Sequence, residues 1–90
     1  MNIMEKQREI EILMRDGSTR EEAEKHLKNG TMIIDDFEEN MDSYIKEFSD
    51  DDVVGFDAES FREMVKTKKP LPDWGVVEKD GKTYYICYCL

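Results

Sequence analysis

The sequence is poor in histidine, cysteine, tryptophan and proline. It holds one histidine, two cysteines and one tryptophan among 90 residues, and only two prolines. No stretch reaches the roughly 18 consecutive apolar residues that a transmembrane helix needs. The N-terminus is charged from Glu5 onward, so the pattern of a secretory signal peptide is missing as well. We therefore expect a cytoplasmic protein that forms one domain over residues 1–90 and carries no cofactor.

The nucleophilic and metal-binding side chains are poorly spaced for chemistry. Cys87 and Cys89 are two positions apart, which on a strand puts them on one face at the far edge of disulfide distance. We expect both to be reduced. Together with His26 they offer at most three zinc ligands, and no nucleophile lies near His26 in the sequence. We expect no zinc site and no catalysis, and an enzyme that uses His26 or the cysteines is the least favoured hypothesis.

A calcium-binding loop is matched only in part. Asp50, Asp52 and Gly55 stand at positions 1, 3 and 6 of an EF-hand loop. Position 5 is Val54, however, and position 12 is Phe61, where a bidentate glutamate is required. Two essential ligands are therefore missing, and we expect no dedicated metal site.

Negative charge is concentrated in the middle third of the chain. The net charge of −9 divides into −1 for residues 1–34, −10 for residues 35–63 and +2 for residues 64–90. Such a field repels nucleic acids and membranes and attracts cationic protein surfaces. The same charge argues against a DNA-binding helix-turn-helix over residues 4–48, because the acids of that segment would face the DNA phosphates. The expected partner is a cationic protein surface, with no direct nucleic acid and no membrane.

The apolar pattern predicts an α+β fold with about four short helices followed by a C-terminal antiparallel β-hairpin. Expected helices run over 4–15, from a capping box Ser18-x-x-Glu21 to 29, over 36–48, and from an N-cap at Asp57 to 68. The apolar run 31–34 fits either a strand or the start of the third helix. The domain then consists of a helical hairpin over 1–30, an acidic helical region over 31–69 and a β-hairpin over 73–90.

The C-terminal hairpin is the clearest strand signal. Asp80-Gly81 between two β-rich runs predicts a two-residue turn that pairs Val77 with Tyr84. Both faces of the hairpin are apolar, and two strands alone are not stable in water. One face must pack on the helices, and the other is covered by more of the chain, by a second copy or by a partner. The possible dimer face consists of Trp74, Val76, Tyr85 and Cys87.

Eight acids form the candidate partner-binding surface. One interpretation is a solvated face that contributes only solubility. In the other, the carboxylates imitate a strip of phosphates, which follow each other in duplex DNA at one charge per ~1.7 Å, and occupy the basic groove of a nucleic-acid enzyme. The eight are Asp35, Asp36, Glu38, Glu39, Asp42, Asp50, Asp51 and Asp52.

The second predicted helix and the loop before it resemble a known helical motif. Residues 12–27 resemble the first helical hairpin of UBA-like domains, where a glycine-containing loop precedes a run of the type Ser-Arg-Glu-Glu-Ala, here Ser18-Thr19-Arg20-Glu21-Glu22-Ala23. The aromatic residue usual in the UBA loop is absent, so the resemblance implies a helical shape and not ubiquitin binding.

In size, acidity and missing catalytic parts, the chain is similar to small acidic proteins of phages and mobile elements of Gram-positive bacteria. Some of these are anti-CRISPR inhibitors of host defence that act as DNA mimics. The function predicted from the whole sequence is a non-catalytic, protein-binding inhibitor, of which a DNA mimic of this kind is one form. The alternative is a structural protein that homodimerises through its C-terminal hairpin.

Overall fold

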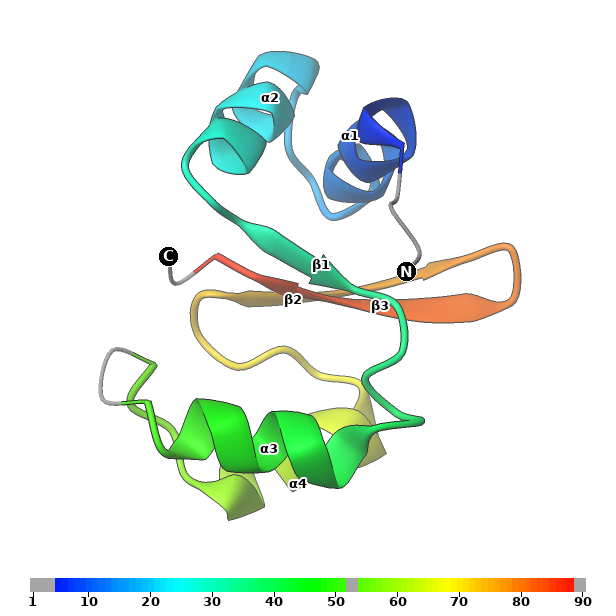
Figure 1. Ribbon diagram of the computed structural model, residues 1–90. Coiled ribbons are helices and arrows are strands. Elements are labelled where there is room, and N and C mark those ends of the chain that lie inside the picture. Colours follow the sequence, from blue (N-terminus) through cyan, green and yellow to red (C-terminus); the bar gives the residue numbers. More distant parts are fainter. Residues whose placement is uncertain (1–4, 52–53, 89–90) are drawn as a thin grey trace.

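The computed structural model describes residues 5–51 and 54–88 and combines four helices with three strands in one antiparallel sheet (Figure 1). In chain order the elements are α1 (Lys6–Arg15), α2 (Arg20–Lys28), β1 (Met32–Ile34), α3 (Met41–Ser49), α4 (Ala58–Thr67), β2 (Trp74–Lys79) and β3 (Lys82–Cys87). The α+β prediction is confirmed. Its strand count is wrong, because 32–34 is a strand, and the region 31–69 is therefore not wholly helical.

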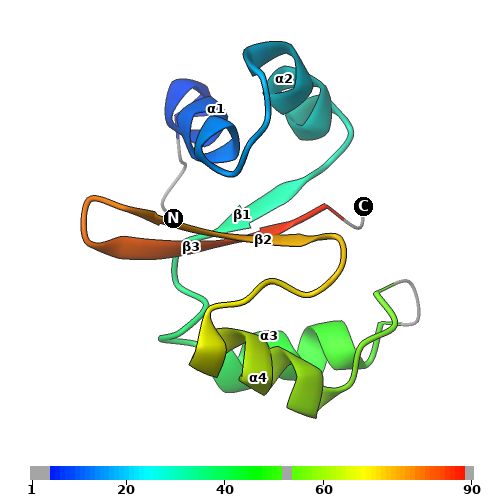
Figure 2. The ribbon, with the colours of Figure 1, turned by 180° about the vertical axis from the view of Figure 1, so that it is seen from behind.

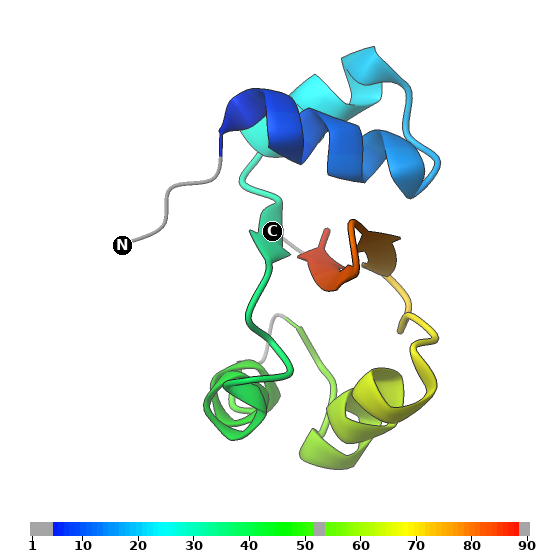
Figure 3. The ribbon, with the colours of Figure 1, turned by 90° about the vertical axis from the view of Figure 1, so that its right-hand side faces the viewer.

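Helices cover both faces of the sheet. The pair α1 and α2 lies on one face, and the pair α3 and α4 lies on the other (Figures 1 and 2). Seen along the strands, α3 lies beneath β1 and α4 beneath β2 (Figure 3). Among residues 5–51 and 54–88 the strand order is β1-β3-β2, so β3 is central and β1 and β2 each have one edge without a neighbouring strand. This layering sets up the site described below, because β1 is an edge strand with helices above and below it.

The hairpin between β2 and β3 has the predicted turn and register. Val77 lies opposite Tyr84, as the two-residue turn requires. Asp80 and Gly81 both have positive φ angles, 54° and 76°, which is the backbone of the type I′ turn that matches the twist of paired strands. The strand β1 then pairs with the free side of β3, with Ile33 opposite Ile86.

Each face of the sheet has its own apolar core. Between the sheet and α1/α2 the buried residues are Ile10, Ile12, Leu13, Ala23, Val77, Tyr84 and Ile86. Between the sheet and α3/α4 they are Ile34, Phe37, Ile45, Phe48, Val54, Phe61, Met64, Trp74, Tyr85 and Cys87. In the second core the ring centroid of Phe37 lies 5.0 Å from that of Tyr85. The sheet is therefore apolar on both sides because it is buried on both sides.

The possible dimer face is covered by the chain itself. Trp74, Tyr85 and Cys87 are buried in the core that α3 and α4 close, and Val76 packs against its rim. Of the three coverings considered for the hairpin, more of the same chain is the one found. A dimer built on these four side chains would require α3 and α4 to leave the sheet.

The end of α1 explains why the capping box of α2 lies one residue later than predicted. Gly17 has a φ of 108°, and the Ser18 N–H donates to the Leu13 carbonyl at 3.1 Å, which is the bond of a Schellman C-cap. Ser18 therefore closes α1. The N-cap of α2 is Thr19, whose Oγ1 accepts from the Glu22 N–H at 3.1 Å while Glu22 accepts from the Thr19 N–H at 2.9 Å. The capping box predicted at Ser18 and Glu21 is wrong by one position.

The remaining helix boundaries lie close to the expected positions, except for the start of α3. Asp57 caps α4 as predicted, accepting from the Ser60 N–H at 2.8 Å. The start expected for α1, Met4, lies outside the described residues. Within 5–51 and 54–88, no helix has the length and apolar character that crossing a membrane requires.

Candidate functional site

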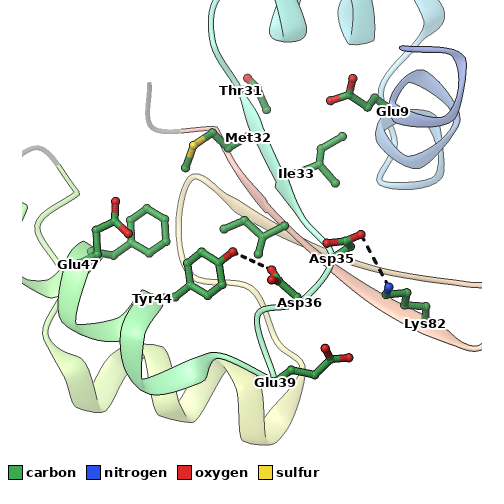
Figure 4. Close-up of a pocket in the computed structure, with 12 residues that line it drawn as sticks. Glu9, Thr31, Met32, Ile33, Asp35, Asp36, Glu39, Tyr44, Glu47 and Lys82 are labelled. Carbon is green, nitrogen blue, oxygen red and sulfur yellow. Dashed lines mark hydrogen bonds and ion pairs between the residues drawn. The ribbon is translucent and has the colours of Figure 1, made fainter. Parts of the chain in front are cut away.

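The open edge of β1 lies in a groove between the two helical layers. This hollow of about 700 Å³, which we name the β1 groove, has residues 31–36 along its floor. Glu9 of α1 lines one side, and Tyr44 and Glu47 of α3 line the other (Figure 4). Glu39, Phe48 and Lys82 complete its wall. The groove is thus assembled from the first helix, the first strand, the turn that follows it, the third helix and the last strand.

The turn at 35–40 shapes one wall, and it replaces the first turn of the helix predicted from residue 36. The Asp36 carboxylate accepts a hydrogen bond from Tyr44 Oη at 2.7 Å and from Asn40 Nδ2 at 3.1 Å. Asp and Asn side chains commonly stabilise turns in this way instead of joining a helix. Phe37 is held in the core, and α3 begins only at Met41. The helix start expected at residue 36 is therefore wrong, and Asp36 faces the groove.

The β1 groove carries a strong excess of negative charge. Five carboxylates and one ammonium line it, which leaves a net formal charge of −4. Lys82 pairs with Asp35 at 3.7 Å across partly exposed side chains, a geometry worth little in water. Burial raises the pKa of the Glu9 carboxyl above its usual range, because desolvation penalises its charged form. A cation placed here would meet carboxylates that are only partly neutralised.

Tyr44 contributes a hydroxyl to the same groove. Its hydrogen bond to Asp36, followed by partial burial and the nearby negative charges, raises its pKa from 10.0 to about 12. The phenol is protonated at neutral pH, and it donates to Asp36. This fixes the Asp36 carboxylate against α3 and determines where its charge lies.

The structure divides seven of the eight predicted acids among three places. Asp35, Asp36 and Glu39 line the β1 groove. Glu38, Glu39 and Asp42 line a smaller hollow of about 280 Å³ at the start of α3. Asp50 and Asp51 lie at the other end of α3, and Asp52 lies outside the described residues. Glu38 also accepts from Tyr85 Oη at 3.2 Å.

Five polar residues of the groove were not predicted from the sequence: Glu9, Thr31, Tyr44, Glu47 and Lys82. For Tyr44 and Glu47 a signal exists, because residues three apart on a helix share a face. Glu9 and Lys82 come from opposite ends of the chain, and no local pattern reports that they meet at β1.

Two of the residues considered for catalysis, His26 and Cys87, pack against other side chains of the chain. The His26 ring lies edge-on to Tyr88, with centroids 4.9 Å apart. Cys87 is fully buried in the core, and Cys89 lies outside the described residues. In the part of the chain that the structure describes, no group of three or more His, Cys, Asp or Glu side chains could hold a metal ion.

Comparison of the chain with protein-family models, with curated proteins and with solved structures gives no match.

Proposed function

We propose that this protein is a non-catalytic inhibitor that binds the cationic groove of a nucleic-acid enzyme. Its carboxylates take the place of phosphates, in the manner of a DNA mimic. The observation that carries the proposal is the grouping of carboxylates on and around α3, in the β1 groove and in the hollow beside it. Electrostatic attraction between such a surface and a basic groove makes association fast, and the attraction weakens as the salt concentration rises.

The solvent-facing acids of α3 give this proposal a specific epitope. Glu38, Glu39, Asp42 and Asp50 are all exposed, in the turn before α3, in its first turn and at its C-cap. Glu38 is tied to the core by its bond from Tyr85 Oη, whereas Glu39, Asp42 and Asp50 can meet a partner without a change in the core. Neutralising Asp42 and Asp50 should weaken binding and leave the fold intact.

A binding experiment with matched variants tests the proposal. The wild-type protein is immobilised and exposed to a bacterial lysate, and bound proteins are eluted first with duplex DNA and then with salt. The Asp42→Asn/Asp50→Asn variant removes two charges next to α3, and the control Glu59→Gln/Glu63→Gln removes two exposed charges from α4. Asp42 and Glu59 both lie in the first turn of their helix, so the loss of these two charges has matched effects on helix stability.

The expected result is a nucleic-acid enzyme that duplex DNA displaces from the wild type and from the α4 control, and that the α3 variant retains poorly. Its activity on DNA should fall in proportion to added protein. Partners that resist displacement by DNA, or that bind all three proteins equally, would show that the acids do not occupy a nucleic-acid site.

A further inference from the structure

The two outer edges of the sheet differ in which side chains of the protein lie along them. On the outer side of β2, the Glu78 carbonyl accepts from Arg15 Nη1 at 2.9 Å. The Glu78 side chain pairs with Lys68 at 3.1 Å along the same edge. Charged side chains on an edge strand are a common means of preventing further strand pairing. At Glu78, therefore, this edge is occupied by side chains of the chain itself.

The backbone of β1 points its free groups into the groove. The two-residue turn makes Lys79 and Lys82 a hydrogen-bonded pair, and because strands alternate, Tyr85 directs its N–H and C=O to β1. Ile34, opposite Tyr85, therefore bonds inward, and Ile33 directs its N–H and C=O outward. Among the described residues no backbone group bonds to Ile33 from that side.

Charge decides what can pair with this edge. A second copy of the chain would bring its own groove of net charge −4 against the first, and like charges at such an interface are unfavourable. A strand that carries lysine or arginine would place its cations among the carboxylates. The other common occupant of an open edge, self-association, is thus disfavoured by the groove itself.

We propose that β1 is the docking edge for an extended, lysine- or arginine-bearing segment of a partner protein, which adds to the sheet as a fourth strand. Main-chain hydrogen bonds to Ile33 supply affinity, as in other cases of strand addition. Side chains of the added strand alternate between Glu9 on the α1 side and Asp36 and Glu47 on the α3 side (Figure 4). Basic residues at every second position all face one side of the added strand, and the α3 side, with Asp36 and Glu47, fits them best. The inference deepens the proposed function and rests on it only in requiring a cationic partner.

Synthetic peptides test the role of the backbone separately from that of charge. The probe is a short, end-capped peptide that alternates lysine with threonine. Two isomers carry N-methyl groups on every second backbone amide, either on the lysines or on the threonines, so charge and composition are equal. Because only one set of N–H groups can face β1, at least one isomer should bind about tenfold more weakly than the unmethylated peptide. Equal binding of all three peptides would show attraction by charge alone and overturn the proposal.

Amide exchange provides a residue-specific readout on the protein. In the free protein the Ile33 amide should exchange faster than that of Ile34, whose N–H bonds to β3. Adding the unmethylated peptide should slow exchange at Ile33 selectively. No change at Ile33 in the saturated complex would place the peptide elsewhere and overturn the proposal. Protection at Ile33 that grows with protein concentration alone would identify a second copy as the occupant and overturn the proposal as well.

Variants of the chain complete the test. Ile33→Pro removes the outward N–H without removing a bond to β3, and Ile33→Val keeps it. The proline variant should lose peptide binding and the valine variant should retain it. If Ile33→Pro does not fold, the methylated peptides still decide the question. Glu47→Gln should weaken binding severalfold, and the control Glu63→Gln on α4 should not. A peptide that fails while DNA still displaces the cellular partner would refute strand addition and leave the proposed function standing.

Discussion

Gly75 of β2 offers a sharp test of how the α1 layer packs on the sheet. A Cβ built at this position would overlap the Asp16 carboxylate, whose Cγ lies 2.9 Å away. That carboxylate accepts a hydrogen bond from Tyr88 Oη at 2.6 Å. In Gly75→Ala, Asp16 has to move and give up this bond. A hydrogen bond to a charged group contributes about 1.5–3 kcal/mol, and the methyl group returns about 0.4–1 kcal/mol by restricting the unfolded chain. We expect a net destabilisation of about 1–2 kcal/mol.

A double-mutant cycle isolates the cause. In an Asp16→Ala background the obstacle is gone, so Gly75→Ala should be neutral or slightly stabilising there. The coupling between the two sites is then about 2 kcal/mol. The free energy of unfolding is measured by urea denaturation, followed by circular dichroism and by the fluorescence of Trp74, the sole tryptophan. If Gly75→Ala destabilised the protein equally in both backgrounds, the overlap with Asp16 would not be the reason, and the packing argument would be refuted.

Three further predictions concern the groove and its support. Tyr44→Phe should lower the free energy of unfolding by about 1–2 kcal/mol at neutral pH, because the bond to Asp36 is lost. The raised pKa of Tyr44 stabilises the wild type below pH 10.0 and ceases to do so as pH rises through about 12, so urea titrations should converge over that range. Phe37→Ala should cost about 3–5 kcal/mol and unfold most of the protein by circular dichroism, since its ring is fully buried. Asp57→Ala should lower the melting temperature, because it removes the side chain that caps α4 at the Ser60 N–H. That bond lowers the pKa of the Asp57 carboxyl, so the difference in melting temperature from wild type should vanish as pH falls and the carboxyl becomes protonated. An unchanged difference at acidic pH would exclude this cap as the cause.

Local signals in the sequence were sufficient for the elements that depend on near neighbours. The turn at Asp80 and Gly81 requires positive φ angles that these residue types supply, so its register follows from the turn alone. The cap at Asp57 is similarly local. The third strand could not be predicted in this way, because 32–34 is only three residues long and its partner lies more than fifty residues downstream. A short apolar run carries no periodicity that separates a strand from a helix.

The start of α3 shows where local rules compete. Both Asp36 and Asn40 suit a helix N-terminus, and acids in a first turn favour the helix dipole. In the structure the side chain of Asp36 is engaged by Tyr44 and Asn40, while Phe37 is committed to the core. Burial of that ring outweighs the propensity of the segment to extend the helix. The sequence pattern alone does not tell whether helix propensity or burial of Phe37 dominates, because the residues that contact Asp36 and Phe37 are known only from the folded structure.

The candidate site was foreseen in part. Its charge could be anticipated from residues 35–42, but its shape could not. The groove exists because β1 is an edge strand between two helical layers, and that follows from the topology of the sheet. Glu9 belongs to a segment of nearly balanced charge, and only the packing of α1 brings it to β1.

The central place of β3 governs the order in which the protein can fold as it is synthesised. Ile33 can pair only after Ile86 has been synthesised. At a synthesis rate of roughly 5–20 residues per second, the intervening residues take about 3–10 s. Neither core can close before then, because both rest on β3. Meanwhile the apolar strand β1 is followed by residues 35–63, whose net charge of −10 repels other incomplete chains. The acids that line the finished groove thus also protect the strand beside them before its partner has been made.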